Sequence, residues 1–173
     1  MGKLILISGE NNSGKSLYAE RIAVQAGATR FYIATMVPHT EENRIRIQKH
    51  IRQRSGLNFH TLECPYCVAE SAVSPDSVAL LEDVSNLLSN AVFEKGGDGA
   101  SVLDDIWKLS ERCKTLVAVT ISDLNSDNYD GETAAYIDML NKLNQALSER
   151  AEIHIRMEAG SPVFLKGAPP YAD

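Results

Sequence analysis

The sequence predicts an α/β fold in which a mostly parallel sheet is flanked by helices. Three observations predict it. Apolar, strand-like runs alternate with helix-like segments along the 173 residues. A glycine-rich loop joins the first strand to the first helix, and the last two strand-like runs are close enough to pair as an antiparallel hairpin. Such alternation places parallel strands in the middle and helices on both faces.

The first half of the chain alternates regularly between the two kinds of element. Leu4-Ile5-Leu6-Ile7 is an uninterrupted apolar run that indicates a buried strand, and helical spacing of small and apolar residues follows it. The predicted elements are a strand over Lys3–Ser8, a helix over Gly14–Ala26, a strand over Phe31–Thr35, a helix over Thr40–Arg54 and a strand over Asn58–Glu63. In the charged fourth element, Ile45, Ile47 and Ile51 are available for burial.

The second half continues the pattern and ends in a hairpin. The predicted elements are a strand over Ser77–Leu81 that ends in Glu82-Asp83, a helix over Val84–Phe93, a break at Gly96–Gly99, a helix over Val102–Cys113, a strand over Leu116–Thr120, a polar loop over Asp123–Gly131 and a helix over Glu132–Arg150. Ile153–Met157 and Pro162–Lys166 pair around Ala159-Gly160-Ser161, which gives the sheet an antiparallel C-terminal edge, and the tail Gly167–Asp173 is expected to be loose.

Length and composition limit the class of protein. The 173 residues predict one domain, residues 1–173, and the net charge of −6 disfavours a broad nucleic-acid surface. No apolar run reaches the ~20 residues of a membrane span, and the N-terminus lacks a signal-peptide pattern. We therefore expect a cytoplasmic protein that has neither a nucleic-acid partner nor a membrane span.

Three cysteines are present, an odd number that argues against a disulfide framework. Cys64 and Cys67 have C-x-x-C spacing, which is compatible with half a metal site or with a redox pair. A structural zinc site needs four ligands, and no second C-x-x-C or H-x₃-H follows. The preferred interpretation is that Cys64, Cys67 and Cys113 are small, partly buried thiols.

The most informative motif is Gly9-Glu10-Asn11-Asn12-Ser13-Gly14-Lys15-Ser16, which fits G-x-x-x-x-G-K-[ST] between a strand and a helix. In this context backbone N–H groups close around phosphate oxygens, and the helix N-terminus favours the negative charge. Lys15 supplies a positive charge and the Ser16 hydroxyl can ligate Mg²⁺. The motif predicts a P-loop NTPase-like (RecA-like) fold that binds a nucleoside triphosphate through residues 9–16.

A second acidic position follows the apolar strand Val78–Leu81. A carboxylate at the carboxyl end of a parallel strand is suitably placed beside a metal-bound triphosphate. Both Glu82 and Asp83 are candidates, and Asp83 also suits the cap of the next helix. We assign Glu82 to Mg²⁺ together with Ser16.

The helix Thr40–Arg54 carries Arg46, His50 and Arg54 at successive spacings of four, along one face. A solvated helix face without function is the alternative interpretation. Flanking arginines disfavour an imidazolium and could hold phosphates, so the pattern is also typical of a neutral, nucleophilic histidine.

An ordered set of residues runs through nearly the whole chain: the loop Gly9–Ser16, Tyr32–Thr35, Glu42, Arg46–His50, Arg54, Thr61, Glu63, Leu80–Glu82, Asn90, Asp138 and Asn144-Gln145. In this set the chain resembles the bifunctional adenosylcobinamide kinase/adenosylcobinamide-phosphate guanylyltransferases of cobalamin synthesis.

The resemblance implies a function and its participants. GTP (or ATP) and Mg²⁺ would be used, a corrinoid would accept the transferred groups, and His50 would carry GMP as a covalent intermediate. Lys15 would assist catalysis, and Arg46, Arg54 and Glu63 would join the loop in binding nucleotide. The resemblance also implies a homo-oligomer, with a trimer as the expected form.

The chain departs from the family pattern at several positions. Glu10 and Asn12 replace a small and a basic residue, Thr120–Leu124 replaces Thr-Asn-Glu-Val-Gly, and Ala134 and Asn141 replace an arginine and a glycine. The departures predict a weaker kinase step, while the retained His50 helix predicts guanylyl transfer. The alternative hypothesis is a divergent paralogue that binds nucleotide without catalysis.

Overall fold

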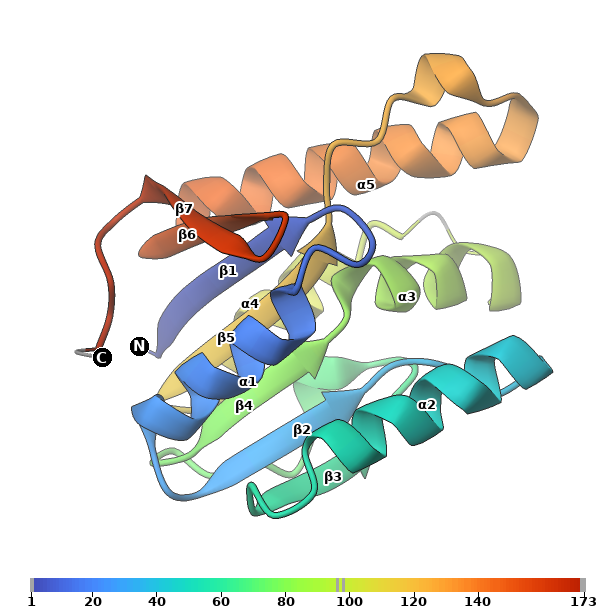
Figure 1. The fold of residues 1–173 in the computed structure, drawn as a ribbon. Coiled ribbons are helices and arrows are strands. Elements are labelled where there is room, and N and C mark those ends of the chain that lie inside the picture. Colours follow the sequence, from blue (N-terminus) through green and yellow to red (C-terminus); the bar gives the residue numbers. More distant parts are fainter. Residues whose placement is uncertain (1, 96, 98, 172–173) are drawn as a thin grey trace.

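A seven-stranded sheet forms the centre of the computed structural model, which describes residues 2–95, 97 and 99–171 (Figure 1). The strands are β1 (Lys3–Gly9), β2 (Arg30–Ala34), β3 (Phe59–Glu63), β4 (Val78–Glu82), β5 (Thr115–Ile121), β6 (Ile153–Glu158) and β7 (Ser161–Lys166). They lie in the order β3-β2-β4-β5-β1-β6-β7, and all neighbours are parallel except β6 and β7. The predicted sheet and its antiparallel edge hairpin are therefore confirmed.

The helices agree with the predicted ones apart from their ends and one division. They are α1 (Lys15–Ala26), α2 (Glu41–Gln53), α3 (Val84–Ser89), α4 (Val102–Arg112) and α5 (Gly131–Arg150), with short helices η1 (Val68–Glu70), η2 (Asn90–Glu94) and η3 (Ser126–Asn128). The predicted helix over Val84–Phe93 changes at Asn90 from α to π geometry. In the predicted break, residues 96 and 98 lie outside the described residues, as do residues 172 and 173 of the tail.

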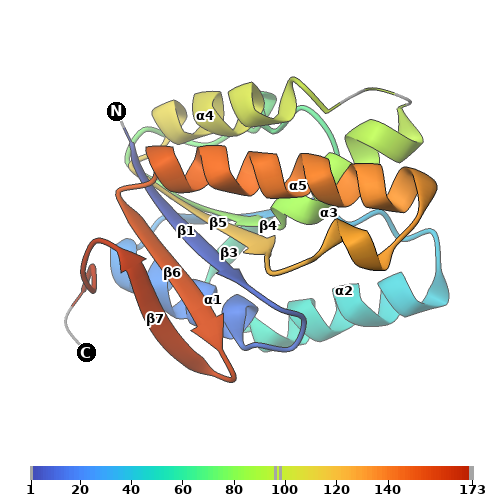
Figure 2. The same cartoon turned by 90° about the horizontal axis from the view of Figure 1, so that it is seen from above.

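Helices cover both faces of the sheet (Figure 2). The helices α1 and α2 lie on one face, and α3, α4 and α5 lie on the other. The chain moves toward β3 through α1 and α2 and then back toward β6 through the remaining helices. Right-handed crossovers require this change of face when the direction reverses.

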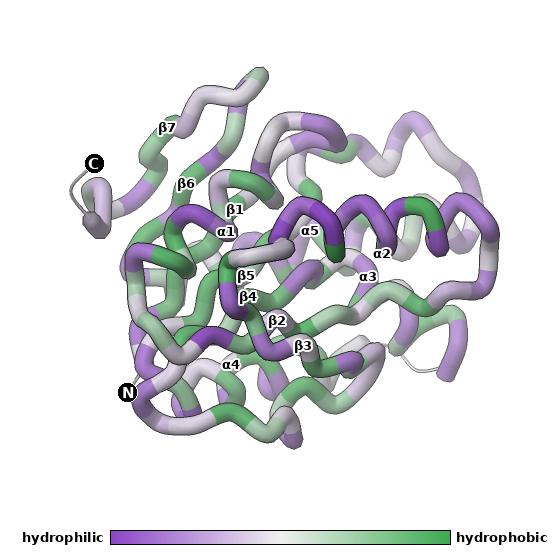
Figure 3. The backbone as a smooth tube through the Cα atoms, turned by 60° about the horizontal axis from the view of Figure 1, so that its bottom comes forward, coloured by the Kyte–Doolittle hydropathy of each residue, from purple (hydrophilic) through white to green (hydrophobic). Residues whose placement is uncertain are grey.

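The core consists of two layers because strand side chains alternate between faces. In β1, Leu4 and Leu6 pack with α3, α4 and α5, whereas Ile5 and Ile7 pack with α1. Figure 3 shows hydrophobic residues along the central strands and also in parts of the helices. Among the described residues, no helix combines the length and the apolar character that a membrane crossing requires.

Candidate functional site

The glycine-rich loop connects the carboxyl end of β1 to the start of α1, as predicted. A Cβ atom on Gly9 would lie 2.6 Å from Ser13 Oγ and 2.9 Å from the Met157 carbonyl oxygen, so a larger residue would displace the loop. Gly14 has a φ of +88°, which L side chains rarely adopt. The two glycines of the motif are therefore required by the loop conformation itself.

The C-terminal hairpin supports this loop from the side. The Gly160 N–H donates a hydrogen bond of 3.0 Å to the Ser13 carbonyl oxygen. Gly160 lies in the turn between β6 and β7, beside the loop (Figure 1). The sequence predicted the hairpin but not its contact with a loop that is 147 residues earlier in the chain, and this contact helps to fix the loop geometry.

Lys15 is buried at the first position of α1. Its Nζ donates a hydrogen bond of 3.0 Å to the Glu10 carbonyl oxygen. Burial lowers the pKa of Lys15, and the carboxylates of Asp83 and Glu82 partly oppose the shift. The amine therefore lies close to two acidic groups inside the site, where an anionic ligand would compensate for the lost hydration.

Glu82 ends β4 and contacts the loop through Ser16. The Ser16 hydroxyl donates a hydrogen bond to Glu82 Oε1, while Oε2 is buried and has no partner among the described residues. Burial, together with the neighbouring Asp83, raises the pKa of Glu82 to about 8. A hydroxyl beside a carboxylate with an unpartnered oxygen is the donor set that a hard cation prefers.

Asp83 caps α3, as the sequence predicted. Its Oδ1 accepts hydrogen bonds from the Asn86 N–H (2.7 Å) and the Ser85 hydroxyl (2.8 Å). Burial raises the pKa of Asp83 and these hydrogen bonds oppose the shift. The capping bonds hold the Asp83 carboxylate at the start of α3, whereas the Glu82 carboxylate contacts the Ser16 hydroxyl of the loop.

These residues fit a Mg²⁺ ion that is held partly by a nucleotide. Within the described ranges, no group of three or more histidine, cysteine, aspartate or glutamate residues could hold a metal by itself. Mg²⁺ commonly keeps waters and substrate phosphates as ligands and takes only one or two from protein. Ser16 and Glu82 meet that smaller requirement.

The helix α2 lies at the rim of the site. Its N-cap is Thr40, and none of its residues is fully buried. The predicted burial of Ile45 and Ile51 was wrong: their side chains are 62% and 43% exposed. The helix instead has a polar contact with α1, in which Gln53 Nε2 donates a hydrogen bond of 2.9 Å to the buried Glu20 carboxylate.

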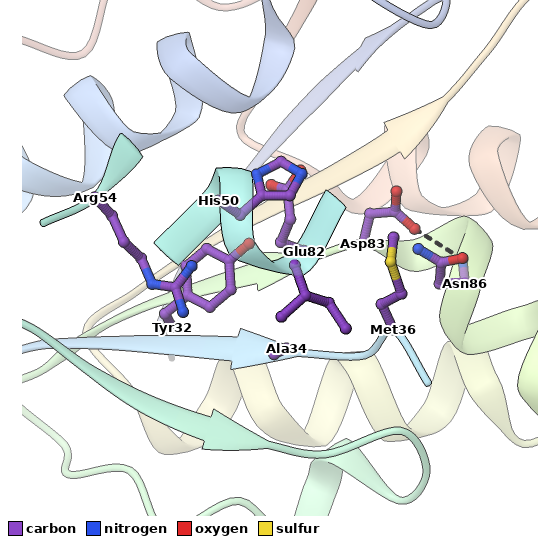
Figure 4. Close-up of a pocket in the computed structure, with 9 residues that line it drawn as sticks. Tyr32, Ala34, Met36, His50, Arg54, Glu82, Asp83 and Asn86 are labelled. Carbon is purple, nitrogen blue, oxygen red and sulfur yellow. Dashed lines mark hydrogen bonds between the residues drawn. The ribbon is translucent and has the colours of Figure 1, made fainter. Parts of the chain in front are cut away.

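His50 projects from α2 toward Glu82 and Asp83, in a small cavity of about 40 Å³ that Tyr32 and Arg54 also line (Figure 4). Its Nδ1 is buried and has no hydrogen-bond partner among the described residues. Burial lowers the pKa of His50 most, followed by the charge of Arg54, with smaller effects from Lys49 and Arg46. The predicted neutral ring agrees with this direction, but desolvation, rather than the arginines, is its chief cause.

The two arginines have different environments. Arg46 is exposed, and its guanidinium donates a hydrogen bond of 2.7 Å to the Glu42 carboxylate one turn away. Arg54 is buried, with its guanidinium carbon 3.7 Å from the centre of the Tyr32 ring and one nitrogen 3.1 Å from the Thr61 hydroxyl. Arg54 is therefore held against the sheet, whereas Arg46 can reorient toward a ligand.

A cleft of about 540 Å³ brings most of the predicted site together. Residues of the loop, residues of α2, and Glu82 and Asp83 at the end of β4 all line it. The residues that line it are Asn11–Leu17, Met36, Arg46, Lys49, His50, Gln53, Glu82, Asp83, Asn86 and Ile121.

Some predicted residues lie outside this cleft. Glu63 is exposed and lines a separate hollow beyond the end of β3. Glu10 lines a third hollow, of about 470 Å³, on the hairpin side of the loop, with Asn12 and Asp123. Three positions that depart from the family pattern therefore face the same space.

Sequence reasoning did not identify several lining residues. Lys49 and Gln53 face the loop beside Arg46 and His50, because positions i, i+3, i+4 and i+7 share one face of a helix. Counting only in steps of four from Arg46 led to Arg54, which lies further round the helix. Asn86, three residues after the Asp83 cap, had no sequence signal for the cleft.

Comparisons with solved structures show the fold. The flagellar accessory protein FlaH from Methanocaldococcus jannaschii has a TM-score of 0.53 at 17% identity, covering 95% of this chain and 78% of that one. A type III secretion ATPase has a TM-score of 0.51 at 16% identity, covering 90% and 51%. At these identities the likeness extends to the P-loop ATPase fold alone.

Sequence comparisons are more specific. A sequence model described as "Cobinamide kinase / cobinamide phosphate guanyltransferase" matches residues 5–165. The bifunctional adenosylcobalamin biosynthesis protein CobP of Pseudomonas aeruginosa is 31% identical over 172 residues, covering 95% of this chain and 98% of that protein. The CobU protein of Salmonella typhimurium, with the same description, is 26% identical over 168 residues, covering 86% and 92%.

Proposed function

Because this chain belongs to the cobinamide kinase / cobinamide phosphate guanyltransferase family, we propose that it phosphorylates adenosylcobinamide and then transfers GMP from GTP to the product. The observation that carries the proposal is the position of His50. A half-buried imidazole with a lowered pKa faces a cleft that residues of the phosphate loop also line. A module that only bound nucleotide would not need this nucleophile.

The first step of guanylyl transfer is a displacement at the α-phosphorus of GTP. An unprotonated ring nitrogen of His50 donates its electron pair, a P–N bond forms, and the bond to the β-phosphate oxygen breaks to release pyrophosphate. Lys15 and the loop N–H groups hold the phosphates during this step. Bound Mg²⁺, held by Ser16, Glu82 and phosphate oxygens, would neutralise the charge on the leaving group.

The second step returns His50 to its starting state. A phosphate oxygen of adenosylcobinamide phosphate attacks the same phosphorus, the P–N bond breaks, and adenosylcobinamide-GDP leaves. The lowered pKa of His50 supports this exchange, since the free ring is unprotonated at neutral pH and ready for another cycle.

The kinase step would use the same loop. The γ-phosphoryl group passes to the hydroxyl of adenosylcobinamide, and the contribution of the protein is mainly positioning and charge neutralisation by Lys15 and the loop.

The family resemblance also favours GTP as the guanylyl donor and a homo-oligomeric assembly. The exposed Ile45 and Ile51 of α2 offer apolar surface to a second copy.

The experiment that tests the proposal is an adduct assay. The protein is mixed with Mg²⁺ and α-labelled GTP, denatured, and examined for bound label that is labile in acid and stable in base, as a phosphoramidate is. Label that appears and is then discharged by adenosylcobinamide phosphate supports the proposal. Tight GTP binding without label would instead support the alternative, a paralogue that binds nucleotide without catalysis.

Glu82→Ala and Asp83→Ala are expected to have different effects. Glu82→Ala should impair Mg²⁺-dependent turnover much more than Mg²⁺-free nucleotide binding, because it removes the carboxylate that contacts Ser16. Asp83→Ala should mainly lower the free energy of unfolding, by about 1 kcal/mol, through loss of the α3 cap. Turnover assays of both variants measure the first effect, and denaturant unfolding of both variants measures the change in the free energy of unfolding. Exchange of the two phenotypes would place the metal ligand at Asp83.

Phosphorylation of adenosylcobinamide is expected to be slower than guanylylation of its phosphate. The motivation is that Glu10, Asn12 and Asp123, which depart from the family pattern, line one hollow beside the loop, while the His50 helix keeps the pattern. Separate assays of the two half-reactions under identical Mg²⁺ and nucleotide concentrations decide the matter. A kinase rate well above the guanylylation rate would contradict the expectation.

A further inference from the structure

The segment Cys64-Pro65-Tyr66-Cys67 lies between β3 and η1 and takes no part in the proposed reaction. The Cys64 N–H donates a hydrogen bond of 2.8 Å to the Ala34 carbonyl oxygen, and this bond fixes the backbone at the start of the segment. Cys67 has a φ of +53°, a left-handed conformation that turns the chain. The two cysteines line the same hollow, of about 420 Å³.

The environments of the three thiols differ. Cys67 is exposed, in contrast to the predicted partial burial. Cys64 is half-buried: its thiol donates a hydrogen bond of 2.9 Å to the Tyr66 carbonyl oxygen, and its sulfur accepts one of 3.7 Å from the Ser71 hydroxyl. Cys113 is buried, and burial raises its pKa to about 11. The chain therefore presents an accessible pair and a third thiol that is inert at neutral pH.

A metal site is a poor match to this pair. Across the ranges that the structure describes, neither cysteine belongs to a group of three or more potential metal-binding side chains. A soft metal would have two thiolates and no further protein ligand from this set. Sulfur–sulfur chemistry needs only the two cysteines.

We propose that Cys64 and Cys67 are a reversible dithiol–disulfide pair, oxidised by a low-molecular-weight disulfide such as oxidised glutathione. The exposed Cys67 loses its proton and attacks one glutathione sulfur, which forms a mixed disulfide and releases one glutathione thiolate. The Cys64 thiolate then attacks the Cys67 sulfur and displaces the second glutathione. The two protons from the protein thiols are taken up by the two glutathione molecules, so atoms and electrons balance.

A short chain of hydrogen bonds connects this segment to the cleft. The Asn90 Nδ2 donates both to the Pro65 carbonyl oxygen (3.0 Å) and to the Thr35 carbonyl oxygen (2.7 Å). The Thr35 hydroxyl in turn accepts a hydrogen bond of 2.8 Å from the Asp83 N–H. A disulfide between Cys64 and Cys67 would change the position of the Pro65 carbonyl group. We therefore expect oxidation to shift the backbone at Glu82-Asp83 through the hydrogen bonds of Asn90 and Thr35.

The test uses the full chain in buffers with stepped ratios of reduced to oxidised glutathione. Free thiols are alkylated and the peptides are analysed by mass spectrometry, and the affinity for a fluorescent GTP analogue is measured on the same samples. We expect the peptide that contains Cys64 and Cys67 to lose two hydrogens while Cys113 stays reduced. The affinity should change by about fivefold or more and recover with dithiothreitol.

Cys67→Ser is the matched control, because the side chain is exposed and the change is small. Its nucleotide affinity should be the same in reducing and oxidising buffer. The proposal is overturned if Cys67 keeps a glutathione adduct while Cys64 remains free, or if the internal disulfide forms and the affinity does not change. The thiol mapping requires no catalysis, so its result is independent of whether GMP transfer occurs.

Discussion

Replacing His50 with asparagine is expected to eliminate the labelled GMP adduct and to slow guanylyl transfer by roughly 10⁴-fold or more, the scale of loss when a covalent nucleophile is removed. Triphosphate binding by the loop should remain, because residues 9–16 are unchanged and Ser13 is still held by the Gly160 N–H of the hairpin. The fold should tolerate the change, since His50 Nδ1 has no hydrogen-bond partner to lose among the described residues. Adduct labelling and equilibrium GTP binding measure the two effects.

His39→Asn provides the matched control for this variant. His39 is exposed, 3.6 Å from Glu94, and outside the residues that line the cleft, so its replacement should leave the adduct intact. Arg46→Ala should slow adduct formation without preventing it, because the nucleophile remains. Label on the His50→Asn protein would mean that another residue is the nucleophile, with His39 and His60 the first to test.

The pH dependence follows from the lowered pKa of His50. Only the neutral ring is nucleophilic, so adduct formation should rise with pH, and the midpoint of the rise should lie below 6.5, the ordinary value. The same shift affects stability, because the unfolded chain binds this proton at a higher pH than the folded one. The free energy of unfolding should therefore fall as pH drops from about 6.5 through the lower folded-state pKa, and this fall should be smaller in the His50→Asn protein.

Lys15→Ala is expected to weaken Mg²⁺–GTP binding by about 100-fold, because two charged hydrogen bonds of about 1.5 kcal/mol each to the β- and γ-phosphates are lost. Removal of a buried, partly desolvated amine should not unfold the protein, since among the described residues its side chain donates a hydrogen bond only to the Glu10 carbonyl oxygen. Titration calorimetry with GTP and Mg²⁺ measures the affinity, and thermal unfolding checks the fold.

Lys49→Ala is the comparison for Lys15→Ala. Lys49 lines the same cleft from the exposed helix α2, so its loss should weaken binding much less. Equal affinities of the Lys15→Ala and parent proteins would show that the triphosphate does not use the loop. Equal losses in the two lysine variants would indicate general charge attraction to the cleft rather than a specific contact at Lys15.

The sequence determined the elements of this protein because local patterns specify them. The apolar run before Gly9, the helical spacing after it, and the Asp83 cap each depend on residues within a few positions of one another. For the same reason the glycine spacing predicted a phosphate loop, while His50 was proposed from its helix pattern together with the family resemblance.

Only the tertiary structure determined which of these residues meet. Ser16 contacts Glu82 across 66 positions, and Gly160 contacts Ser13 across 147, distances in sequence over which periodicity carries no information. The exposure of Ile45 and Ile51 and the burial of Arg54 against Tyr32 likewise depend on where α2 lies at the sheet edge. The neutral state of His50 follows mainly from desolvation, a property of the folded surroundings that spacing along a helix cannot supply.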